Sequence, residues 1–331
     1  MPSESPKRRQ KVKKAPFDAI FGMIKFGFWN FKPYFCASKT KGTIENDRHI
    51  GARPGSGPIG FFDSGYGGLT VLRGVRQLLP DYDYLYLGDN ARAPYGTRSF
   101  NIVTDFTRQS VDYLFKQGCP LVILACNTAS AKALRTLQQT WLPDTVDPTR
   151  RILGVIRPTA ETIGTITRNG HVGIFATPGT IASKSYDMEI AKLWPGTTVT
   201  GQACPMWVPL IENGEADKPG ADYFVDEYID MLLERDPLTD TIILGCTHYP
   251  ILYDKIRASL DRRGRQDIKL VRQGAIVAES LKDYLTRHPE MDARLTRGGT
   301  TAYRTTEDPE RFSSLAAMFM GEPVNAEFTR L

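Results

Sequence analysis

From Ile59 onward, short apolar segments alternate with amphipathic segments along the chain. The apolar segments, each of which predicts a strand, are IGFF (59–62), YLYL (84–87), LVILA (121–125), ILGVI (152–156), HVGIF (171–175), TIILG (241–245) and IKLV (268–271). Helical periodicity predicts helices over 69–79 and 221–236. Strands that are apolar throughout are buried on both faces, which is typical of a parallel sheet covered by helices. The pattern therefore predicts an α/β fold.

Two of these segments form a near-repeat, LVILACNTAS (121–130) and TIILGCTHYP (241–250). Each apolar run ends at a small residue, which is followed by a cysteine and then by small polar groups. The seven predicted strands could form one sheet. The near-repeat instead favours two sheets, one in each of two domains.

Ligand sites in parallel α/β folds lie at the carboxyl ends of the strands. The polar residues at these ends are Asp63-Ser64, Gly88-Asp89, Cys126-Asn127-Thr128, Thr177 and Cys246-Thr247-His248. The stretch DSGYGGLT (63–70) lacks the last glycine of a dinucleotide fingerprint and the GK[ST] of a phosphate loop. Its glycines and helix start suit a small anionic ligand, and they equally suit an ordinary tight turn.

The basic character of the chain is concentrated at its start. Residues 1–50 carry eleven Lys and Arg against four Asp and Glu, whereas the remainder carries 31 against 33. The nearly neutral body has no nucleic-acid footprint, and no nucleic-acid partner is expected. Residues 1–56 combine a basic run, aromatic residues and a Gly/Pro-rich linker. They are interpreted as a flexible extension without a packed core, with weak contact to an anionic membrane surface and a start codon assigned too far upstream as alternatives.

Five cysteines are spread along the chain, namely Cys36, Cys119, Cys126, Cys204 and Cys246. Their odd number and the absence of a CxxC pair argue against a disulfide framework and for a reducing cytoplasm. No apolar run approaches the ~20 residues of a membrane helix, and no secretory signal is expected. Cys119 and Cys204, each directly before a proline, are predicted to be small buried residues.

Cys126 and Cys246 differ because polar residues follow each of them. Each is predicted to precede a helix, whose dipole would lower the thiol pKa from ~8.5 toward neutrality. A zinc site built from Cys126, Cys246 and His248 lacks a fourth ligand, so no metal is predicted. A Cys–His pair for hydrolysis, with His248 as the base, leaves the second cysteine without a role. Two equivalent thiols suit inversion at a carbon next to a carboxylate, where one group removes a proton and the other returns one to the opposite face.

Five motifs carry a family resemblance, namely FDSGYGGLTVL (62–72), YLGDNARAPYG (86–96), ACNTASA (125–131), PLIENGE (209–215) and GCTHYP (245–250). Together they resemble the glutamate racemases of the cofactor-independent aspartate/glutamate racemase superfamily. The resemblance implies two Rossmann-like parallel-sheet domains, related by pseudo-symmetry, with the active site in the cleft between them. The first domain would comprise 57–148 plus 264–331 and the second 149–263, with 1–56 outside the resemblance.

The resemblance also implies residue roles. Cys126 would be the base for D-glutamate and Cys246 the base for L-glutamate, assisted by Asp63 and His248 respectively. The substrate-binding residues would be Asp63, Ser64, Tyr95, Gly96, Asn127, Thr128, Thr177, Thr247, His248 and Glu212. One segment, GVIRPTAE (154–161), departs from the commoner pattern because Arg157 replaces an acidic residue.

The implied function is interconversion of L- and D-glutamate without metal or cofactor. It would supply D-glutamate for peptidoglycan, and thereby serve cell-wall biogenesis and cell shape, from the cytoplasm. Dimers are common in the family, so a homodimer is one candidate assembly, and the sequence alone does not fix the oligomer. The alternatives are a racemase of aspartate or a related amino acid with the same mechanism, and a non-catalytic amino-acid-binding protein.

Overall fold

The computed structural model describes residues 55–331. The predicted extension 1–56, with Cys36 and the predicted membrane contact, lies outside the described residues except for its last two positions. The strands are β1 Ile59–Asp63, β2 Tyr84–Gly88, β3 Leu121–Leu124, β4 Arg151–Gly154, β5 His171–Ala176, β6 Thr198–Ala203, β7 Thr241–Gly245, β8 Lys269–Val271, β9 Thr301–Thr305 and β10 Ala326–Phe328.

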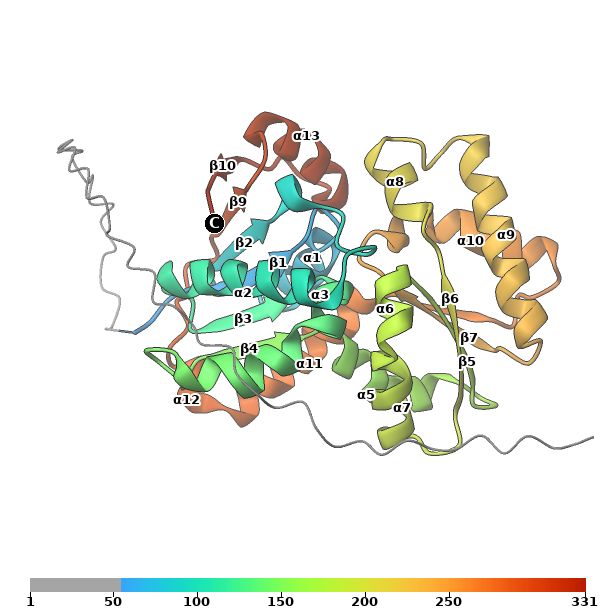
Figure 1. Cartoon of the computed structure of the whole chain (residues 1–331), viewed down its shortest axis with the longest axis horizontal. Coiled ribbons are helices and arrows are strands. Elements are labelled where there is room, and N and C mark those ends of the chain that lie inside the picture. Colours follow the sequence, from blue (N-terminus) through green and yellow to red (C-terminus); the bar gives the residue numbers. More distant parts are fainter. Residues whose placement is uncertain (1–54) are drawn as a thin grey trace, which may run out of the picture. The chain divides into compact units, whose positions relative to one another are not determined.

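The strands form two separate, wholly parallel sheets (Figure 1). One has six strands in the order β10-β9-β2-β1-β3-β4, and the other has four in the order β6-β5-β7-β8. We call the six-stranded sheet with its helices the first lobe and the four-stranded sheet with its helices the second lobe. The predictions of an α/β fold and of two sheets are thereby confirmed.

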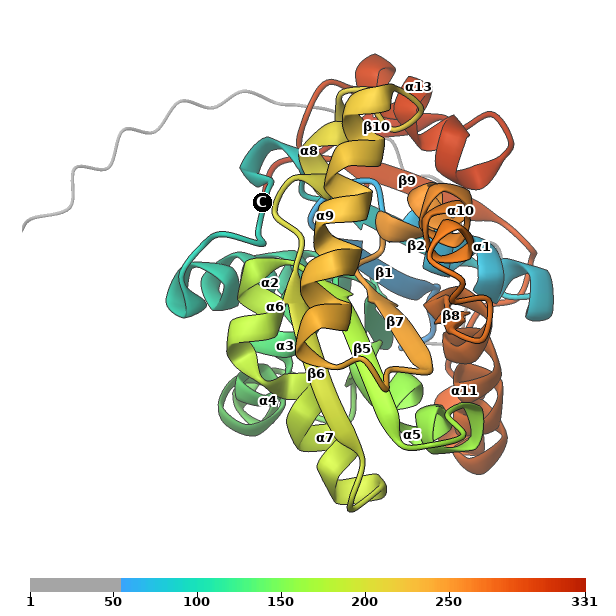
Figure 2. The ribbon, with the colours of Figure 1, turned by 90° about the vertical axis from the view of Figure 1, so that its right-hand side faces the viewer.

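Helices connect successive strands. The α-helices are α1 Leu69–Leu78, α2 Phe100–Lys116, α3 Asn127–Lys132, α4 Leu134–Thr136, α5 Ile156–Ile166, α6 Pro178–Ser183, α7 Ser185–Leu193, α8 Trp207–Glu212, α9 Pro219–Arg235, α10 Tyr253–Arg262, α11 Gln273–Arg287, α12 Pro289–Asp292 and α13 Pro309–Met320. The remaining helical segments are 3-10 or π in type, namely η1 Asn90–Arg92, η2 Leu137–Trp141, η3 Leu142–Asp144 and η4 Tyr249–Leu252. Figure 2 looks onto the second lobe, where α9 lies in front of the sheet.

All seven predicted strands and both predicted helices are present. Three further strands, β6, β9 and β10, were not predicted from the sequence. Neither β6 (TVTGQA) nor β10 (AEF) contains the continuous apolar run by which the seven predicted strands were found, because polar or small residues interrupt both. In β9 (TAYRT), only Ala302 and Tyr303 are apolar, which is too short a run to separate from a loop.

Alternate strand residues enter different cores, as a sheet covered on both faces requires. In β1, Ile59 and Phe61 pack into the core beneath α1, α11 and α13, whereas Phe62 packs into the core beneath α2. In the second lobe, Phe175 of β5 faces α8 and α9, whereas Ile174 faces α5 and α7. This burial fixes the strand ends, and hence the turns that follow them.

The chain passes between the lobes twice, at Val155 between β4 and α5 and at Arg272 between β8 and α11. Sheet membership departs from the predicted domain limits at two strands. Strand β4 lies within the predicted second domain but pairs with β3, and β8 lies within the predicted first domain but pairs with β7. Each sheet keeps the strand that immediately precedes a crossing, because that strand completes its edge.

The two lobes repeat one arrangement, in which β2-β1-β3-β4 corresponds to β6-β5-β7-β8. Residue pairing gives the correspondence in detail, since Phe62 pairs with Leu124 in one sheet and Phe175 with Leu244 in the other. Cys126 and Cys246 each lie two residues beyond the paired leucine. The near-repeat of the sequence is therefore a structural repeat.

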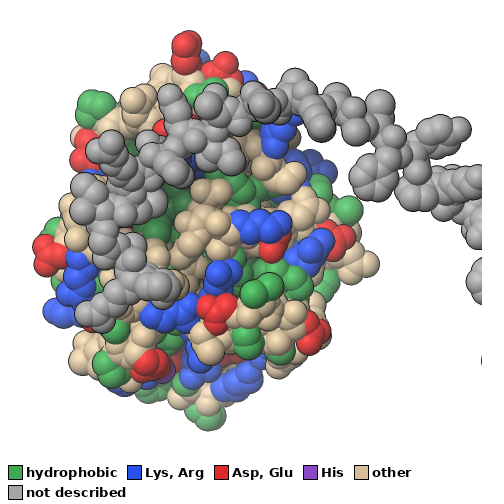
Figure 3. All heavy atoms as spheres, turned by 90° about the vertical axis from the view of Figure 1, so that its left-hand side faces the viewer, with side chains coloured by type: hydrophobic (Ala, Val, Ile, Leu, Met, Phe, Trp, Pro, Cys, Tyr) green, Lys and Arg blue, Asp and Glu red, His purple; other side chains and the backbone are tan. Residues whose placement is uncertain are grey.

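The surface of the described region carries charges of both signs. On the face shown in Figure 3, basic and acidic side chains are scattered among one another and among hydrophobic side chains. Within residues 55–331, no helix combines the length and the apolar character needed to cross a bilayer.

Candidate active site

A cavity of about 90 Å³ lies where the carboxyl ends of the two sheets meet. Most of the residues predicted from the sequence line it, namely Ser64, Tyr95, Gly96, Cys126, Asn127, Thr128, Thr177, Glu212, Cys246, Thr247 and His248. Asp63 is the exception, because it is fully buried behind the lining at 0% exposure. Cys204, predicted to be a structural residue, is buried as expected but also borders the cavity.

The first thiol belongs to Cys126, which follows β3 and caps the start of α3. Its Sγ accepts a hydrogen bond from the backbone N–H of Ala129 at 3.4 Å. The Ser64 Oγ lies 3.3 Å from the same sulfur. These two contacts orient the thiol toward the cavity from the first lobe.

The predicted lowering of the Cys126 pKa is wrong. Burial, followed by the negative charge of Asp63, raises the pKa of this thiol to about 12. The hydrogen bonds from Ser64 and from the N–H of Ala129 act in the opposite direction and are outweighed. A helix start lowers a thiol pKa where solvent also helps to hold the anion, and Cys126 is almost fully buried.

Asp63 ends β1 directly behind this thiol. Its Oδ2 accepts the backbone N–H of Gly65 at 3.0 Å, whereas Oδ1 has no hydrogen-bond partner among residues 55–331. Burial raises the pKa of Asp63, against the lowering effect of His248 and of the N–H groups of Gly68 and Gly65. The first lobe thus places a carboxyl group that holds its proton unusually well next to a protonated thiol.

The second thiol belongs to Cys246, which follows β7. Its Sγ lies 3.9 Å from Nδ1 of His248, and Nε2 of the same ring lies 3.0 Å from Oε1 of Glu212. The segment that follows is a 3-10 turn beginning at Tyr249, so the α-helix expected after Cys246 begins only at Tyr253. The neighbour of this thiol is therefore an imidazole rather than a helix start.

His248 is protonated at neutral pH. Its burial favours the neutral ring, but the hydrogen bonds to Cys246 and Glu212 outweigh burial and raise the pKa of His248 to about 10. A cation here offers a counter-charge to a thiolate on Cys246. The alternative of a Cys–His hydrolase would use only this thiol and this ring, and it leaves Cys126 on the same cavity without a role.

A glycine makes room for this imidazole. A Cβ at Gly67, in the turn between β1 and α1, would lie 2.4 Å from Nδ1 of His248 and 2.3 Å from Oγ1 of Thr247. The nearby Thr70 hydroxyl donates to the Thr247 carbonyl at 3.1 Å. The turn of the first lobe therefore packs directly against Thr247 and His248 of the second lobe, which explains the glycine at position 67 of DSGYGGLT.

Three threonine hydroxyls meet beside the cavity, where the two lobes contact each other. Thr128 of the first lobe lies 2.9 Å from Thr177 and 3.3 Å from Thr180 of the second, measured between Oγ1 atoms. Thr180 was not predicted from the sequence, although it follows the strand-end residue Thr177 by only three positions. Hydroxyls of this kind can turn either a donor or an acceptor toward a ligand.

Tyr95 and Gly96 belong to the loop after η1. The Tyr95 hydroxyl donates to Oδ2 of the buried Asp89. Burial, and then Asp89, raises the pKa of Tyr95, so the phenol stays neutral. The Gly96 carbonyl accepts the N–H of Gly179, and a Cβ at Gly96 would lie 2.8 Å from the Cβ of Thr177. This loop therefore packs directly against the start of α6 in the second lobe, and a side chain at position 96 would separate the loop from that lobe.

Asn127 faces the cavity, but its amide is held by two residues that sequence reasoning missed. Its Nδ2 donates to Gln273 and its Oδ1 accepts the hydroxyl of Tyr186, each at 2.7 Å. Neither partner is close to a site motif in the sequence, so only the fold could have revealed them.

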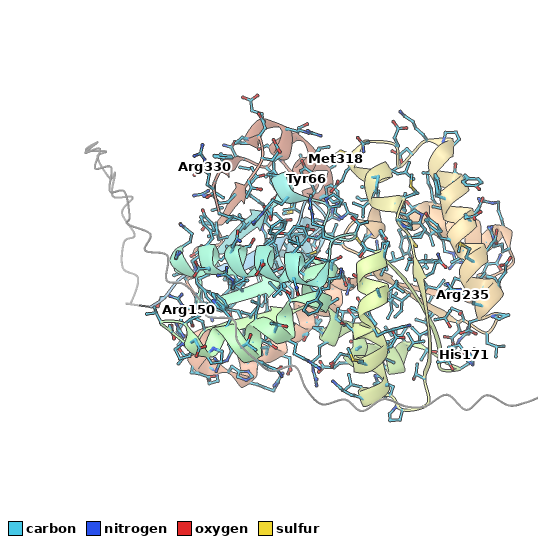
Figure 4. The ribbon with its side chains drawn as sticks, in the orientation of Figure 1. Tyr66, Arg150, His171, Arg235, Met318 and Arg330 are labelled. Atoms are coloured by element: carbon cyan, nitrogen blue, oxygen red, sulfur yellow. The ribbon has the colours of Figure 1, made fainter. Side chains whose placement is uncertain are left out.

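Other features of the described region lie apart from this cavity. Arg157 is exposed, pairs with Glu161 and Glu189, and lines a different cavity of about 840 Å³. A second His–carboxylate pair, His171 with Asp236 at 2.9 Å, lies at the opposite end of β5 (Figure 4). Within residues 55–331, no three His, Cys, Asp or Glu side chains are grouped so that they could hold a metal ion.

The site thus presents two thiols to one small space, one from each lobe. Their surroundings differ in charge, since the carboxyl group of Asp63 lies behind one and the imidazole of His248 beside the other. Such a pair can remove a proton from one face of a bound carbon and deliver one to the other.

Comparisons with known proteins agree with this arrangement. Residues 69–280 match the Asp/Glu/Hydantoin racemase family model. A glutamate racemase of Paracoccus denitrificans is 42% identical over 81% of this chain and 98% of its own. The solved glutamate racemase isoform RacE1 of Bacillus anthracis is 31% identical, with a TM-score of 0.74 over 83% of this chain and 98% of its own.

A glutamate racemase of Francisella tularensis, solved in complex with D-glutamate, is likewise 31% identical, with a TM-score of 0.71 over 83% of this chain and 98% of its own. The family match and these similarities cover both lobes and both cysteine motifs. The chain therefore belongs to the glutamate racemase family, within the Asp/Glu/hydantoin racemases.

Proposed function

We propose that the protein is a glutamate racemase in which Cys126 and Cys246 are the two bases. The observation that carries the proposal is the placement of one thiol from each lobe on a single small cavity. The similarity to glutamate racemases supports glutamate as the substrate rather than aspartate. It also supports turnover rather than binding alone, since both thiols and both neighbouring groups are present.

In the direction from L- to D-glutamate, Cys246 as a thiolate takes the α-proton. The electron pair of the broken C–H bond remains on the α-carbon and is delocalised into the carboxylate. The Cys126 thiol then gives its proton to the opposite face, which leaves Cys126 as the thiolate and Cys246 as the thiol. In the reverse direction, the same two groups exchange roles.

Asp63 and His248 assist the thiols on their own sides. His248 as a cation stabilises a thiolate on Cys246, and Glu212 keeps the ring charged and oriented. Asp63 lies behind Cys126, and its raised pKa suits it to exchange a proton with that thiol during turnover. Ser64, Thr128, Thr177 and Thr247 hold the ammonium and carboxylate groups of the substrate, together with the backbone N–H groups at the start of α3.

The test is an incubation of the purified protein with L-glutamate in deuterated water, with a metal chelator and no added cofactor. Loss of optical rotation together with loss of the α-proton signal is the expected result. Reaction with aspartate but not with glutamate would change the assigned substrate to aspartate and leave the two-thiol mechanism in place. Silence with both amino acids would overturn the proposal, as would a requirement for an added cofactor or metal.

The cellular role follows from the substrate. We propose that the enzyme works without cofactor in the cytoplasm and supplies D-glutamate for peptidoglycan. A homodimer and a weak membrane contact through residues 1–56 stay predictions. Light scattering tests the first, and sedimentation with anionic liposomes, with and without those residues, tests the second.

A further inference from the structure

A buried polar cluster joins the two lobes directly behind Cys126. Its members are Asn127 at the start of α3, Gln273 at the start of α11, Tyr186 of α7 and Thr159 of α5. Each is at most 3% exposed. We infer that Gln273 is a positioning residue for the racemisation, which acts through Asn127 to hold Cys126 in place. The inference rests on the proposed function.

The hydrogen bonds form a closed ring. Asn127 Nδ2 donates to Gln273 Oε1 at 2.7 Å, Gln273 Nε2 donates to the Tyr186 hydroxyl at 2.8 Å, and that hydroxyl donates to Asn127 Oδ1 at 2.7 Å. Each group donates a hydrogen bond to the next, so the loss of any one group breaks two of the three bonds. A buried amide that loses such a partner keeps its full desolvation cost.

The remaining contacts of Gln273 fix its orientation. Its Nε2 also lies 2.9 Å from the Thr159 hydroxyl and 3.2 Å from the Val155 carbonyl. The Thr159 hydroxyl already donates to that same carbonyl at 2.9 Å, so it can only accept from Gln273. A flipped amide would set its oxygen against these acceptors.

The ring sits where the chain crosses between the lobes. Val155 is the first crossing residue, and Gln273 directly follows the second crossing at Arg272. Helix α11 is held close to the first lobe, since a Cβ at Gly74 of α1 would lie 2.8 Å from the backbone of Gly274. Gln273 therefore ties both crossings to the residue that follows Cys126.

Holding Asn127 matters because it is the first residue of α3. With its amide fixed on both sides, the start of the helix cannot rotate, and the Ala129 N–H stays directed at the Cys126 sulfur. The catalysed step at this thiol depends on its position, and misplacement by ~1 Å can cost up to ~10²-fold in rate.

Two variants test the inference, Gln273→Leu and Tyr186→Phe. The matched control is Tyr84→Phe, because Tyr84 is equally buried and its hydroxyl donates to the Leu79 carbonyl at the far end of the first sheet. We expect roughly tenfold lower kcat in the two ring variants and little change in the control. The primary isotope effect with α-deuterated D-glutamate, the enantiomer assigned to Cys126, should rise in the ring variants only.

If either folded ring variant behaves kinetically like Tyr84→Phe, the inference is wrong. A fall in rate without a rise in that isotope effect would also overturn it, because the ring would then support only the fold. Tyr186→Phe removes a single oxygen, so it tests the inference even if Gln273→Leu does not fold. Failure of the unaltered protein to racemise glutamate would instead count against the proposed function.

Discussion

Cys126 and Cys246 occupy equivalent positions in the two sheets, yet their neighbours carry opposite charges. Behind Cys126 lies Asp63, and burial with this carboxyl group raises the thiol pKa to about 12. Beside Cys246 lies His248, whose pKa of about 10 makes it a cation at neutral pH. The fold repeats the thiol but does not repeat its electrostatic surroundings.

The difference can be traced to single positions. Thr128 and His248 each lie two residues after the thiol of their lobe. Each lies against the other lobe, Thr128 at Thr180 in the first turn of α6 and His248 at Gly67 in the turn before α1. Thr180 and Gly67 each lie five positions after the paired phenylalanine of their strand. Gly67 leaves room for the imidazole of His248, whereas Thr180 leaves room only for the smaller side chain of Thr128.

This asymmetry selects one resting state. A protonated Cys126 and a cationic His248 prepare the site for proton removal by Cys246, which in the proposed assignment is attack on L-glutamate. Attack on D-glutamate needs the opposite arrangement. Since enantiomers have equal free energies in water, kcat/KM must still be equal in the two directions. The asymmetry can therefore appear only in kcat, in KM and in isotope effects.

The largest effect is expected from removal of either thiol. Cys126→Ser and Cys246→Ser should each lower racemisation in both directions by roughly 10³- to 10⁴-fold, because a serine hydroxyl cannot exchange protons as a thiol does. Circular dichroism with each enantiomer measures the loss. Exchange of the α-proton with solvent should survive for the one enantiomer whose thiol remains.

The matched control for these variants is Cys119→Ser, since Cys119 is fully buried but does not line the cavity. The folded fraction of Cys119→Ser should keep most of the specific activity of the unaltered protein. Near-normal racemisation by either site variant would show that the two thiols are not equivalent partners, and the comparison between the lobes would fail.

The neighbouring groups should give the next largest effect, about 10²-fold. Asp63→Asn imitates the protonated acid and keeps an acceptor for the Gly65 N–H, whereas His248→Asn removes the cation. Slower proton transfer at one thiol makes that step more rate-limiting. Asp63→Asn should therefore raise the isotope effect with α-deuterated D-glutamate, and His248→Asn should raise it with α-deuterated L-glutamate.

If each variant raises the isotope effect for a different enantiomer, the comparison is sharpened, because each lobe then catalyses proton transfer for one enantiomer. The same response in both variants would mean that Asp63 and His248 act on a shared step. In that case the difference in their charges would have no bearing on direction.

A smaller effect, roughly tenfold in kcat, is expected from Gly67→Ala. The added methyl group would lie 2.4 Å from Nδ1 of His248, which is held by Glu212 and can move only by losing that bond. The control is Gly220→Ala at the start of α9, where a Cβ would meet no atom within 4 Å among the described residues. Unchanged kinetics in Gly67→Ala would show that the tight turn does not set the position of the imidazole.

The repeat was readable from the sequence because both strands that lead to the thiols are fully buried. Continuous burial gives an uninterrupted apolar run, which makes the strand end and the polar residue after it easy to locate. The edge strands β6 and β10 bury fewer residues and lack that signal. The lining residues were predictable to the extent that they follow buried strands or belong to the family motifs.

The electrostatic difference was not predictable from the same patterns. The expectation for Cys126 rested on the helix start alone, whereas burial and a carboxyl group 63 positions away in the sequence decide its pKa. Gln273 and Tyr186 were missed for a similar reason, since they reach Asn127 from helices distant in sequence. Local patterns identify the residues of a site, but the contacts that tune them are made by the fold.

The smallest effect concerns stability and separates the lobes by pH. The folded-state pKa of His248, about 10, exceeds its ordinary value of 6.5, so its contribution to stability is complete below pH 6.5 and is lost as the pH rises through 10. Cys126, raised from 9.0 to about 12, lowers stability only above pH 9. Between pH 7 and 9, the unfolding midpoint of the unaltered protein should therefore fall more steeply than that of His248→Asn, with ~2–4 °C for each kcal/mol lost. Equal slopes would mean that no pH-dependent stabilisation between pH 7 and 9 can be assigned to His248.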